Sequence, residues 1–258
     1  MKDQDMNSLM QHFAAIGLHQ MDQVQLLNRI DRKYIIPLSR LPEVLEHLKS
    51  DYFALEIDGH RIFNYNTTYF DTEGYQFYKD HHNGLTNRVK VRCREYQESK
   101  LTFFEIKRKS KGYRTDKYRQ LLKDSSFEMN EAWYEKIREQ YVKYPFKELK
   151  LALFNRFSRI TLVNKQLTER CTIDFGLDFS SPENDRHIPV NDIAIIEVKQ
   201  SKAFGSPVVQ LLRQMRFYPS GISKYVLGLI LTKEHIKHNA FKSLLHRIDK
   251  IKSLQLTA

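Results

Sequence analysis

The chain has 258 residues, enough for one sizeable core, and hydrophobic residues make up 41% of it, which excludes a disordered chain. Lys and Arg outnumber Asp and Glu by 42 to 31, so the formal net charge is +11 and the expected partners are acidic: nucleic acid, an anionic membrane or a phosphorylated small molecule. The sequence has no signal peptide, no apolar run of about 18 residues and only two cysteines, and it predicts a cytoplasmic protein without membrane spans or a disulfide framework.

Hydrophobic periodicity predicts a β-rich middle flanked by helices. In chain order, the expected elements are a helix at 7–28, a strand at 30–37, a helix at 40–50, strands at 61–70, 87–96, 101–109 and 113–121, a helix at 130–142, strands at 151–163, 169–179 and 191–199, a helix at 207–217, a buried strand at 224–232 and a closing helix at 233–254. This arrangement is typical of an α+β protein built on an antiparallel β-barrel or a strongly curved sheet.

The expected strand at 87–96 carries the clearest functional signal. From Arg88 to Arg94 it reads Arg-Val-Lys-Val-Arg-Cys-Arg, so cations alternate with small apolar residues. Successive side chains of a strand point to opposite faces, and therefore Arg88, Lys90, Arg92 and Arg94 share one face. Four like charges in a row repel one another unless an anion lies among them, so this face is expected to bind phosphate or another polyanion.

Other expected strands repeat the pattern. The residues that share a polar face within each strand are Glu105, Lys107 and Lys109; Lys117 and Arg119; Arg170, Thr172 and Asp174; and Glu197 and Lys199. If these faces line a closed barrel, the protein encloses a cation-rich tunnel with a few carboxylates. The apolar faces then point outward, and the flanking helices are needed to cover them.

Plainer interpretations of these charges stay open at this point. Cations on strand faces are usually solvated, and lysines on edge strands deter aggregation. A carboxylate among cations either neutralises its neighbours or supplies an oxygen ligand to Mg²⁺ or Mn²⁺, with phosphate and water completing the shell. Glu105 and Glu197 are the best candidate ligands because each begins a Glu-x-Lys on one strand face, and Asp174 is the next.

Nine short motifs in a fixed order resemble the VTC domain, the catalytic domain of the vacuolar transporter chaperone polyphosphate polymerases. They are Arg-Lys-Tyr at 32–34, Thr-Tyr-Phe-Asp at 68–71, Arg-Cys-Arg-Glu-Tyr at 92–96, Phe-Glu-Ile-Lys at 104–107, Lys-Tyr-Arg at 117–119, Phe-Asn-Arg at 154–156, Arg-Cys-Thr-Ile-Asp at 170–174, Ile-Glu-Val-Lys at 196–199 and Ser-Lys-Tyr at 223–225. The resemblance covers roughly residues 28–232 and places the chain in the triphosphate tunnel metalloenzyme (CYTH-like) superfamily, as a stand-alone, bacterial-type, single-domain member. It implies an antiparallel β tunnel with a basic interior that binds triphosphate and polyphosphate.

The resemblance and the strand pattern together assign roles to individual residues. Those expected to hold the phosphates at the catalytic centre are Lys33, Arg92, Arg94, Lys107, Arg156 and Arg170. Those expected to bind or guide the phosphate chain are Lys90, Lys117, Arg119, Lys199, Ser223 and Lys224. Glu197 matches the metal-binding glutamate of the family, and Glu105 is the second expected ligand of Mn²⁺ or Mg²⁺.

Two positions depart from the family pattern. The Glu-x-Glu-x-Lys signature of hydrolytic relatives is reduced to Arg29, Asp31 and Lys33, so a weaker or single-metal site is expected. Gly221 stands where the yeast-type polymerases have a lysine, a change that bears on processive elongation rather than on phosphate binding.

The function that the resemblance implies is metal-dependent phosphoryl transfer from ATP to build inorganic polyphosphate. Such a reaction needs mainly positioning and electrostatic stabilisation, and an anionic polyphosphate end needs no side-chain base. The alternatives are an inorganic tri- or polyphosphatase, a nucleoside triphosphatase, or a polyphosphate- or nucleic-acid-binding module without catalysis. A tunnel excludes duplex nucleic acid. We expect a monomer, with a membrane-protein partner left open.

Overall fold

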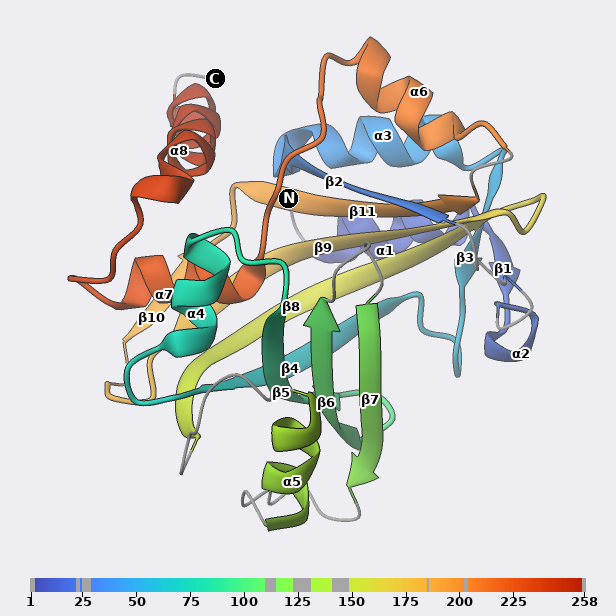
Figure 1. The fold of residues 1–258 in the computed structure, drawn as a ribbon. Helices are drawn as coiled ribbons and strands as arrows, with labels where there is room; N and C mark the ends of the chain where they lie inside the picture. Colours follow the sequence, from blue (N-terminus) through green and yellow to red (C-terminus); the bar gives the residue numbers. More distant parts are fainter. Residues whose placement is uncertain are drawn as a thin grey trace.

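The computed structural model describes residues 3–21, 24, 29–109, 115–122, 131–140, 149–184, 186–201 and 204–256. Figure 1 shows the arrangement of the elements. They are, in chain order, α1 (Asp3–Gln11), β1 (Ala14–Ile16), α2 (Leu18–Met21), β2 (Arg29–Pro37), η1 (Leu38–Arg40), α3 (Leu41–Leu48), β3 (Tyr52–Leu55), β4 (Ile62–Asp71), α4 (Gln76–His82), β5 (Arg88–Tyr96), β6 (Leu101–Lys109), β7 (Thr115–Leu122), α5 (Glu131–Gln140), β8 (Lys150–Asn164), β9 (Glu169–Ser180), β10 (His187–Val190), β11 (Ile193–Ser201), α6 (Pro207–Gln214), α7 (Lys224–Thr232), η2 (Asn239–Phe241) and α8 (Lys242–Leu256).

One sheet of eleven strands forms the body of the molecule, and its main path runs β2-β11-β9-β8-β4-β5-β6-β7. Neighbours along this path are antiparallel, whereas β1 pairs in parallel with β3. In Figure 1 the strands β5, β6 and β7 stand across the direction of β8, β9 and β11, so the sheet is strongly curled. Within the described residues its end strands β2 and β7 are not paired with each other. The α+β class and the antiparallel sheet are confirmed, but the prediction of a closed barrel is wrong.

The outer face of the sheet is apolar and is covered by helices, as the strand pattern requires. Helices α1, α3 and α6 pack over β2, β8, β9 and β11, where α3 contributes Leu41 and Leu45 to a core that includes Ile173 and Ile196. Helix α5 covers β5 and β6, and the ring of Trp133 stacks on Phe104 with 4.4 Å between the ring centroids. Because the apolar side chains point outward, the polar side chains of the same strands are left on the inner face.

Both cysteines belong to these outer cores. Cys93 and Cys171 are free and buried, and each lies among apolar side chains of the sheet. Burial raises the pKa of the Cys93 thiol to about 12, which leaves it protonated and unreactive at neutral pH.

Helix α7 packs against the inner face of the sheet. Its residues Tyr225, Val226 and Leu229 share a core with Leu153 and Phe179 of the sheet. The helix begins after Ser223, whose side chain caps it by accepting a hydrogen bond from the Val226 N–H. A Cβ at Gly228 would lie 2.4 Å from Leu153 and 2.6 Å from Phe179, so only glycine permits this close approach of helix and sheet.

The segment 224–232 was predicted as a buried strand, and that prediction is wrong. An apolar run of this length fits a buried strand and a buried helix equally well, because burial on nearly every side hides the helical period. The serine cap decides for the helix, since it satisfies a backbone N–H of the first turn.

The predicted helix at 7–28 is also wrong. Helix α1 ends at Gln11, and residues Ala14–Ile16 form β1, which pairs with β3. Phe13 packs in the core beneath α1 and α3, whereas Ile16 packs in the core around α7. The two side chains serve different cores, which one straight helix cannot do. Residues 22, 23 and 25–28 lie outside the described part.

The remaining predicted elements are found with shifted ends. The closing helix was expected from residue 233, but α8 begins at Lys242 and follows the short η2. The short elements β3, α4 and β10 were not predicted, because segments of four to seven residues carry too little periodicity. None of the helices within the described ranges is long and apolar enough to cross a membrane.

Candidate active site on the inner face of the sheet

The register of the strands brings most of the predicted site residues onto one surface. Directly paired residues of antiparallel strands point to the same face, and pairs such as Lys33 with Glu197, and Lys90 with Lys107, belong to the inner face. We call this surface the basic face. Its cations are Arg29, Lys33, Arg88, Lys90, Arg92, Arg94, Lys107, Lys109, Lys117, Arg119, Arg159, Arg170 and Lys199, and its carboxylates are Asp31, Glu105, Asp174 and Glu197.

Electrostatic interactions show that distant strands converge across this face. The pKa of Lys107 on β6 is lowered to about 6, first by Arg92, then by burial, and further by cations that include Lys199 on β11. The pKa of Lys90 on β5 is lowered by burial and then by Lys33 on β2. β2 and β11 begin the strand path and β5 and β6 are close to its other end, so curling of the sheet puts their side chains in range.

Glu105 lies at the centre of a cluster of cations. Its side chain is only 2% exposed, and its oxygens lie 2.7 Å from Arg92 Nε and 2.7 Å from Lys117 Nζ, with Arg119 Nε at 3.7 Å. Burial opposes its ionisation, yet Arg92 and Arg94 hold the pKa of the Glu105 carboxyl well below its ordinary value. Both of its oxygens are therefore engaged in neutralising arginine and lysine, which does not fit the predicted role of metal ligand.

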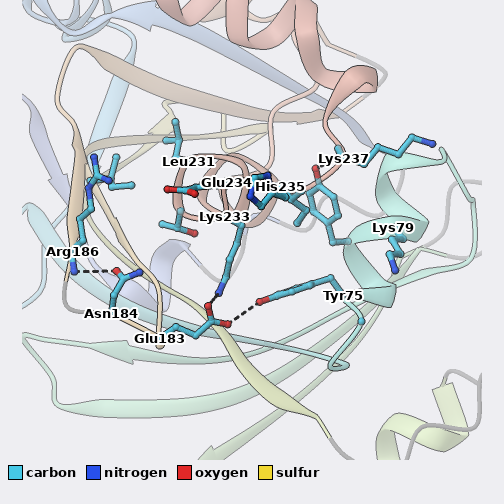
Figure 2. Close-up of a pocket in the computed structure, with 15 residues that line it drawn as sticks. Tyr75, Lys79, Glu183, Asn184, Arg186, Leu231, Lys233, Glu234, His235 and Lys237 are labelled. Carbon is cyan, nitrogen blue, oxygen red and sulfur yellow. Dashed lines mark hydrogen bonds and ion pairs between the residues drawn. The ribbon is translucent and has the colours of Figure 1, made fainter.

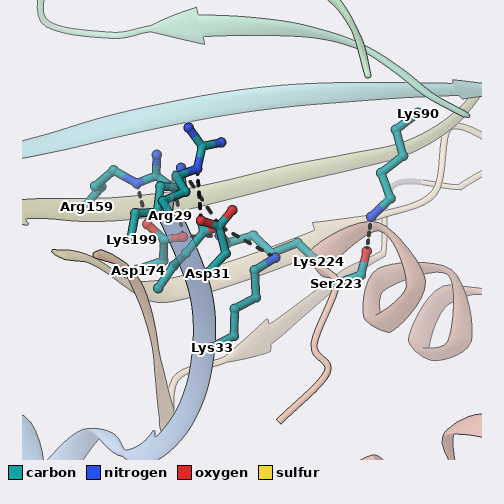
Figure 3. Close-up of polar contacts among 10 residues, drawn as sticks. Arg29, Asp31, Lys33, Lys90, Arg159, Asp174, Lys199, Ser223 and Lys224 are labelled. Atoms are coloured by element: carbon teal, nitrogen blue, oxygen red, sulfur yellow. Dashed lines mark hydrogen bonds and ion pairs between the residues drawn. The ribbon is translucent and has the colours of Figure 1, made fainter. Parts of the chain in front are cut away.

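A second buried cluster joins the sheet to α7. Asp174 accepts hydrogen bonds from Arg159 at 2.5 and 2.8 Å, and it forms an ion pair with Lys224, the first residue of α7. The Lys224 ammonium also lies 4.2 Å from the centre of the Phe157 ring. Figure 3 shows Arg159, Asp174 and Lys224 together beside the pair of Arg29 and Asp31.

The N-terminus of α7 reaches the basic strand β5 at another point. Lys90 Nζ donates a hydrogen bond of 2.8 Å to the Ser223 hydroxyl, which is the pair seen on the right of Figure 3. The predicted residues Ser223 and Lys224 thus meet the basic face from the helix side. The backbone carbonyl of Lys33 on β2 accepts a hydrogen bond from Ser220 N at 2.7 Å, which holds the segment before α7 in place.

Arg94 is the most buried cation of the basic face, with 6% of its surface exposed. Its guanidinium lies 5.5 Å from the ring centres of both Tyr65 and Phe157, and Nε donates to the Thr67 hydroxyl at 3.3 Å. Burial and the neighbouring Arg92 lower the pKa of Arg94 to about 10. A buried cation without a carboxylate at salt-bridge distance is well placed to bind an anion.

The structure contradicts the placement of Arg156 in the site. Arg156 pairs with Asn66 and Asp178, its side chain is exposed, and it points to the outer face of the sheet. Arg159, which was not predicted, takes its place on the inner face. The alternation of side chains along the strand already indicated this difference. Arg156 lies on the same face of β8 as the core residues Ile160 and Leu162, whereas Arg159 lies on the opposite face.

The other predicted residues lie on the basic face in different settings. Lys33 and Lys199 flank Glu197, each with 3.9 Å between its Nζ and a carboxylate oxygen. Arg170 lies at the border of the face, where its guanidinium donates to the Met21 carbonyl at 3.2 Å. These contacts place all predicted residues except Arg156 on or against the basic face.

Glu197 alone among the four carboxylates has the properties of a metal ligand. Its side chain is 24% exposed, its nearest cations are at 3.9 Å, and it accepts no hydrogen bond from the described residues. The hydroxyl of Thr172, a residue paired directly with Glu197, is buried and has no hydrogen-bond partner among the described residues. No cluster of three or more His, Cys, Asp or Glu suited to a metal occurs in the described part of the chain. The residues therefore fit a metal that takes one protein carboxylate and gains its other ligands from substrate and water.

Comparison with protein families decides the assignment of the chain. The family model described as the VTC domain matches residues 28–233. The chain belongs to the VTC domain family. Comparison with curated proteins finds no significant match.

The solved structures to which this VTC domain is similar are distant from it. A protein from Hippeastrum, described as a candidate adenylyl cyclase with a dominant triphosphatase activity, is 12% identical at a TM-score of 0.49, covering 82% of this chain and 100% of its own. A candidate adenylate cyclase from Vibrio parahaemolyticus is 12% identical at a TM-score of 0.42, covering 79% of this chain and 99% of its own. The PH1819 protein from Pyrococcus horikoshii is 11% identical at a TM-score of 0.43, covering 78% and 95%. The family assignment rests on the family match.

The VTC domain also has a pocket of about 760 Å³ away from the basic face. It lies between α4, the end of α7 and the segment before β10, and Figure 2 shows the residues that line it. Lys233 forms an ion pair of 2.6 Å with Glu183, which also accepts a 3.4 Å hydrogen bond from the Tyr75 hydroxyl. The lining carries four cations, Lys79, Arg186, Lys233 and Lys237, against the two carboxylates Glu183 and Glu234, so its excess of positive charge is smaller than that of the basic face.

Proposed function

We propose that this VTC domain transfers phosphoryl groups from ATP to a growing chain of inorganic polyphosphate on its basic face, in the presence of Mn²⁺ or Mg²⁺. The observation that carries the proposal is the imbalance of charge there. Thirteen cations share the basic face with four carboxylates, and three of these carboxylates are within 3 Å of a cation: Asp31 with Arg29 at 2.9 Å, Glu105 with Lys117 at 2.7 Å and Asp174 with Arg159 at 2.5 Å. A polyanion supplies the missing negative charge.

In the proposed reaction, three cations of β5 and β6 hold the β- and γ-phosphates of ATP. Arg92 and Arg94 provide planar guanidinium groups that bind two phosphate oxygens at once, and Lys107 provides a point charge. Because these side chains are buried or half-buried, their attraction for a phosphoryl group is stronger than in water. Arg159 takes the role that the family resemblance assigned to Arg156.

Glu197 would hold the divalent metal. The metal, when bound, supplies additional positive charge at the phosphate oxygens. Lys33 and Lys199 help to keep Glu197 ionised: burial alone would raise the pKa of its carboxyl, but these two lysines, together with Arg159 and Lys107, lower it to about 2. The same two lysines remain near enough to contact the substrate.

The acceptor is the end of a polyphosphate chain, which is already an anion and needs no general base. Lys90, Lys117 and Lys224 line the two sides of the triphosphate position and would guide the chain. The bond that forms joins the terminal oxygen of the chain to the γ-phosphorus, and the bond that breaks releases ADP.

Hydrolysis of triphosphate is the second candidate. It needs an oriented water molecule, and the Thr172 hydroxyl, which is buried next to Glu197 and has no hydrogen-bond partner in the part of the chain that the structure describes, offers it a position. The reduced carboxylate set at Arg29, Asp31 and Lys33 favours the polymerase over the hydrolase.

One assay separates the candidates. Purified protein is incubated with ATP and Mn²⁺, and the products are resolved as polyphosphate and free phosphate. Polyphosphate with one ADP released for each phosphate residue incorporated supports the proposal, and free phosphate alone supports hydrolysis. Formation of neither, with ATP still bound, identifies a binding module and overturns both catalytic candidates.

A further inference from the structure

The two ends of the basic face differ in chemistry. At one end, β5 and β6 present the pair Arg88 and Lys109. At the other end, the same strands present Tyr96 paired with Leu101, and Phe103 on β6 pairs with Leu121 on β7. The charged surface therefore gives way to an aromatic and apolar surface. We call the residues Tyr96, Leu101, Phe103, Arg119 and Leu121 the aromatic end.

Arg119 is held flat within the aromatic end. Its guanidinium carbon lies 3.6 Å from the centre of the Phe103 ring and 5.4 Å from that of Tyr96. One of its terminal nitrogens donates a 2.8 Å hydrogen bond to the Tyr96 hydroxyl. The rings of Tyr96 and Phe103 meet edge to face at 5.6 Å. These contacts hold the planar guanidinium of Arg119 against the rings of Phe103 and Tyr96, in an orientation suited to stacking.

This platform is open to solvent. The Arg119 side chain is 37% exposed, and the flanking Leu101 and Leu121 are 44% and 51% exposed. Large apolar side chains at such exposure stand out next to a surface made of lysine and arginine. An inorganic phosphate chain gains nothing from leucine or from an aromatic ring, so the platform suits another part of a ligand.

The platform adjoins the phosphate-binding cations. Arg119 Nε is 3.7 Å from the Glu105 carboxylate, which itself binds Arg92. Arg94 and Tyr96 are two residues apart on β5, which corresponds to about 7 Å along a strand. This layout matches a ligand in which a short linker joins a flat apolar group to a triphosphate.

We propose that the aromatic end binds the nucleobase of the phosphoryl donor. This inference rests on the proposed function and deepens it, because it assigns a binding position to the base of ATP and thereby sets the direction in which the triphosphate lies. The base stacks on the guanidinium plane of Arg119 and on Tyr96, with Leu101 and Leu121 at its edges. The triphosphate then extends along β5 towards Arg94, Arg92 and Lys90. The new phosphate chain forms on the side of α7, away from the base.

Base stacking predicts a selective loss of affinity that phosphate binding alone does not. The test compares the dissociation constants of ATP and inorganic triphosphate, measured by calorimetry at fixed Mg²⁺ and ionic strength, for wild type and for Phe103→Leu. Leucine keeps an apolar group at this position and removes the ring. We expect the affinity for ATP to fall at least about fivefold, and that for triphosphate to change by less than about twofold.

Two further variants make the test specific. Arg119→Lys keeps the positive charge and removes the planar guanidinium, so it should also lower the affinity for ATP more than that for triphosphate. Phe204→Leu removes an exposed phenylalanine outside the basic face, 55% exposed, and should leave both affinities at their wild-type values.

Equal weakening of ATP and triphosphate in Phe103→Leu would show a structural role only and overturn the base site. No weakening of either ligand would overturn it as well. In both cases wild type would still bind triphosphate, and the proposed function would stand. Failure of wild type to bind either ligand would remove the proposed function together with the base site.

Discussion

Glu105 on β6 and Glu197 on β11 both lie on the basic face and both begin a Glu-x-Lys sequence, but they differ in burial and in the distance to neighbouring cations. Glu105 is 2% exposed and accepts from Arg92 and Lys117 at 2.7 Å, whereas Glu197 is 24% exposed with lysines no closer than 3.9 Å. Each oxygen of Glu105 is in close contact with a cation, whereas both lysines near Glu197 are on the side of Oε1, and neither oxygen of Glu197 has a cation closer than 3.9 Å among the described residues. The sequence predicted both as ligands because distance to neighbouring cations is not visible in a strand pattern.

Replacing Glu197 by Gln should abolish metal-dependent turnover while leaving triphosphate binding in place. The amide is a weak ligand for Mn²⁺ or Mg²⁺, but it leaves the phosphate-binding arginines unchanged. Initial rates with ATP and Mn²⁺, and triphosphate affinity without metal, measure the two effects separately. Retained turnover in Glu197→Gln would refute its role.

Replacing Glu105 by Gln should destabilise the protein when no anion is bound to the basic face. The change leaves the half-buried Arg92 without its carboxylate, and breaking a buried ion pair in this way costs about 3–5 kcal/mol. Urea unfolding with and without triphosphate measures the loss, and triphosphate should recover part of it. Glu73→Gln breaks the exposed pair with Lys150 and should leave the stability nearly unchanged. Equal stability of the two variants would contradict the neutralising role of Glu105.

The affinity for triphosphate should fall as the pH rises above about 6. Arg92, then burial, lower the pKa of Lys107 to about 6 in the anion-free protein, and a bound anion raises it again. Binding therefore takes up a proton above pH 6, and the loss reaches at most about tenfold per pH unit. Lys224, whose pKa burial lowers to about 8, adds its own dependence above that pH.

The measurement is the dissociation constant of triphosphate between pH 6 and 8 in metal-free buffer, for wild type and Lys107→Met. The ratio of the two constants cancels the titration of the ligand itself. Wild type should bind triphosphate more tightly than Lys107→Met at pH 6, and this difference in affinity should become smaller as the pH rises. A ratio independent of pH would show that Lys107 does not change protonation on binding.

At the scale of elements, α7 is the piece that connects the core to the site. Its apolar side packs on the inner face through Leu229 and Val226, and its first residues contact Asp174 and Lys90. The position of Ser223 and Lys224 therefore depends on how closely the rest of the helix approaches the sheet. Gly228 sets this distance.

Replacing Gly228 by Ala should destabilise the protein and weaken triphosphate binding together. The new methyl would meet Leu153 at 2.4 Å, and overpacking of this kind costs about 1–3 kcal/mol. Thermal unfolding and triphosphate affinity are the measurements. Gly221→Ala is the control, because a Cβ there has no atom within 4 Å. A Gly228→Ala variant as stable as the control would contradict the packing of α7.

Long strands with alternating polarity were predictable, and short or fully buried elements were not. Residues 87–96 alternate strictly, and β5 is found at Arg88–Tyr96. The α7 run is apolar at almost every position, so its period is lost and its type was mistaken. Arg156 was misplaced because it was assigned from the short family-like motif Phe-Asn-Arg at 154–156. The alternation of Arg159, Ile160, Thr161 and Leu162 instead indicates which arginine points inward.

At the scale of the whole molecule, the inward direction of the cations was predictable but the closure of the sheet was not. The direction follows from the apolar residues of the same strands, which need a helical cover. Closure depends on whether β2 and β7 reach each other, and that is set by accumulated twist and by bulges such as those in β8. The combined effect of twist and bulges over all the strands cannot be read from any local pattern in the sequence.

The most direct test of the account is a crystal structure with inorganic triphosphate bound. The account predicts the anion on the inner face, in contact with Arg92, Arg94 and Lys107 on one side and within reach of Lys199 from β11 on the other. Triphosphate bound on the outer face, or in the pocket beside Lys233, would contradict the account.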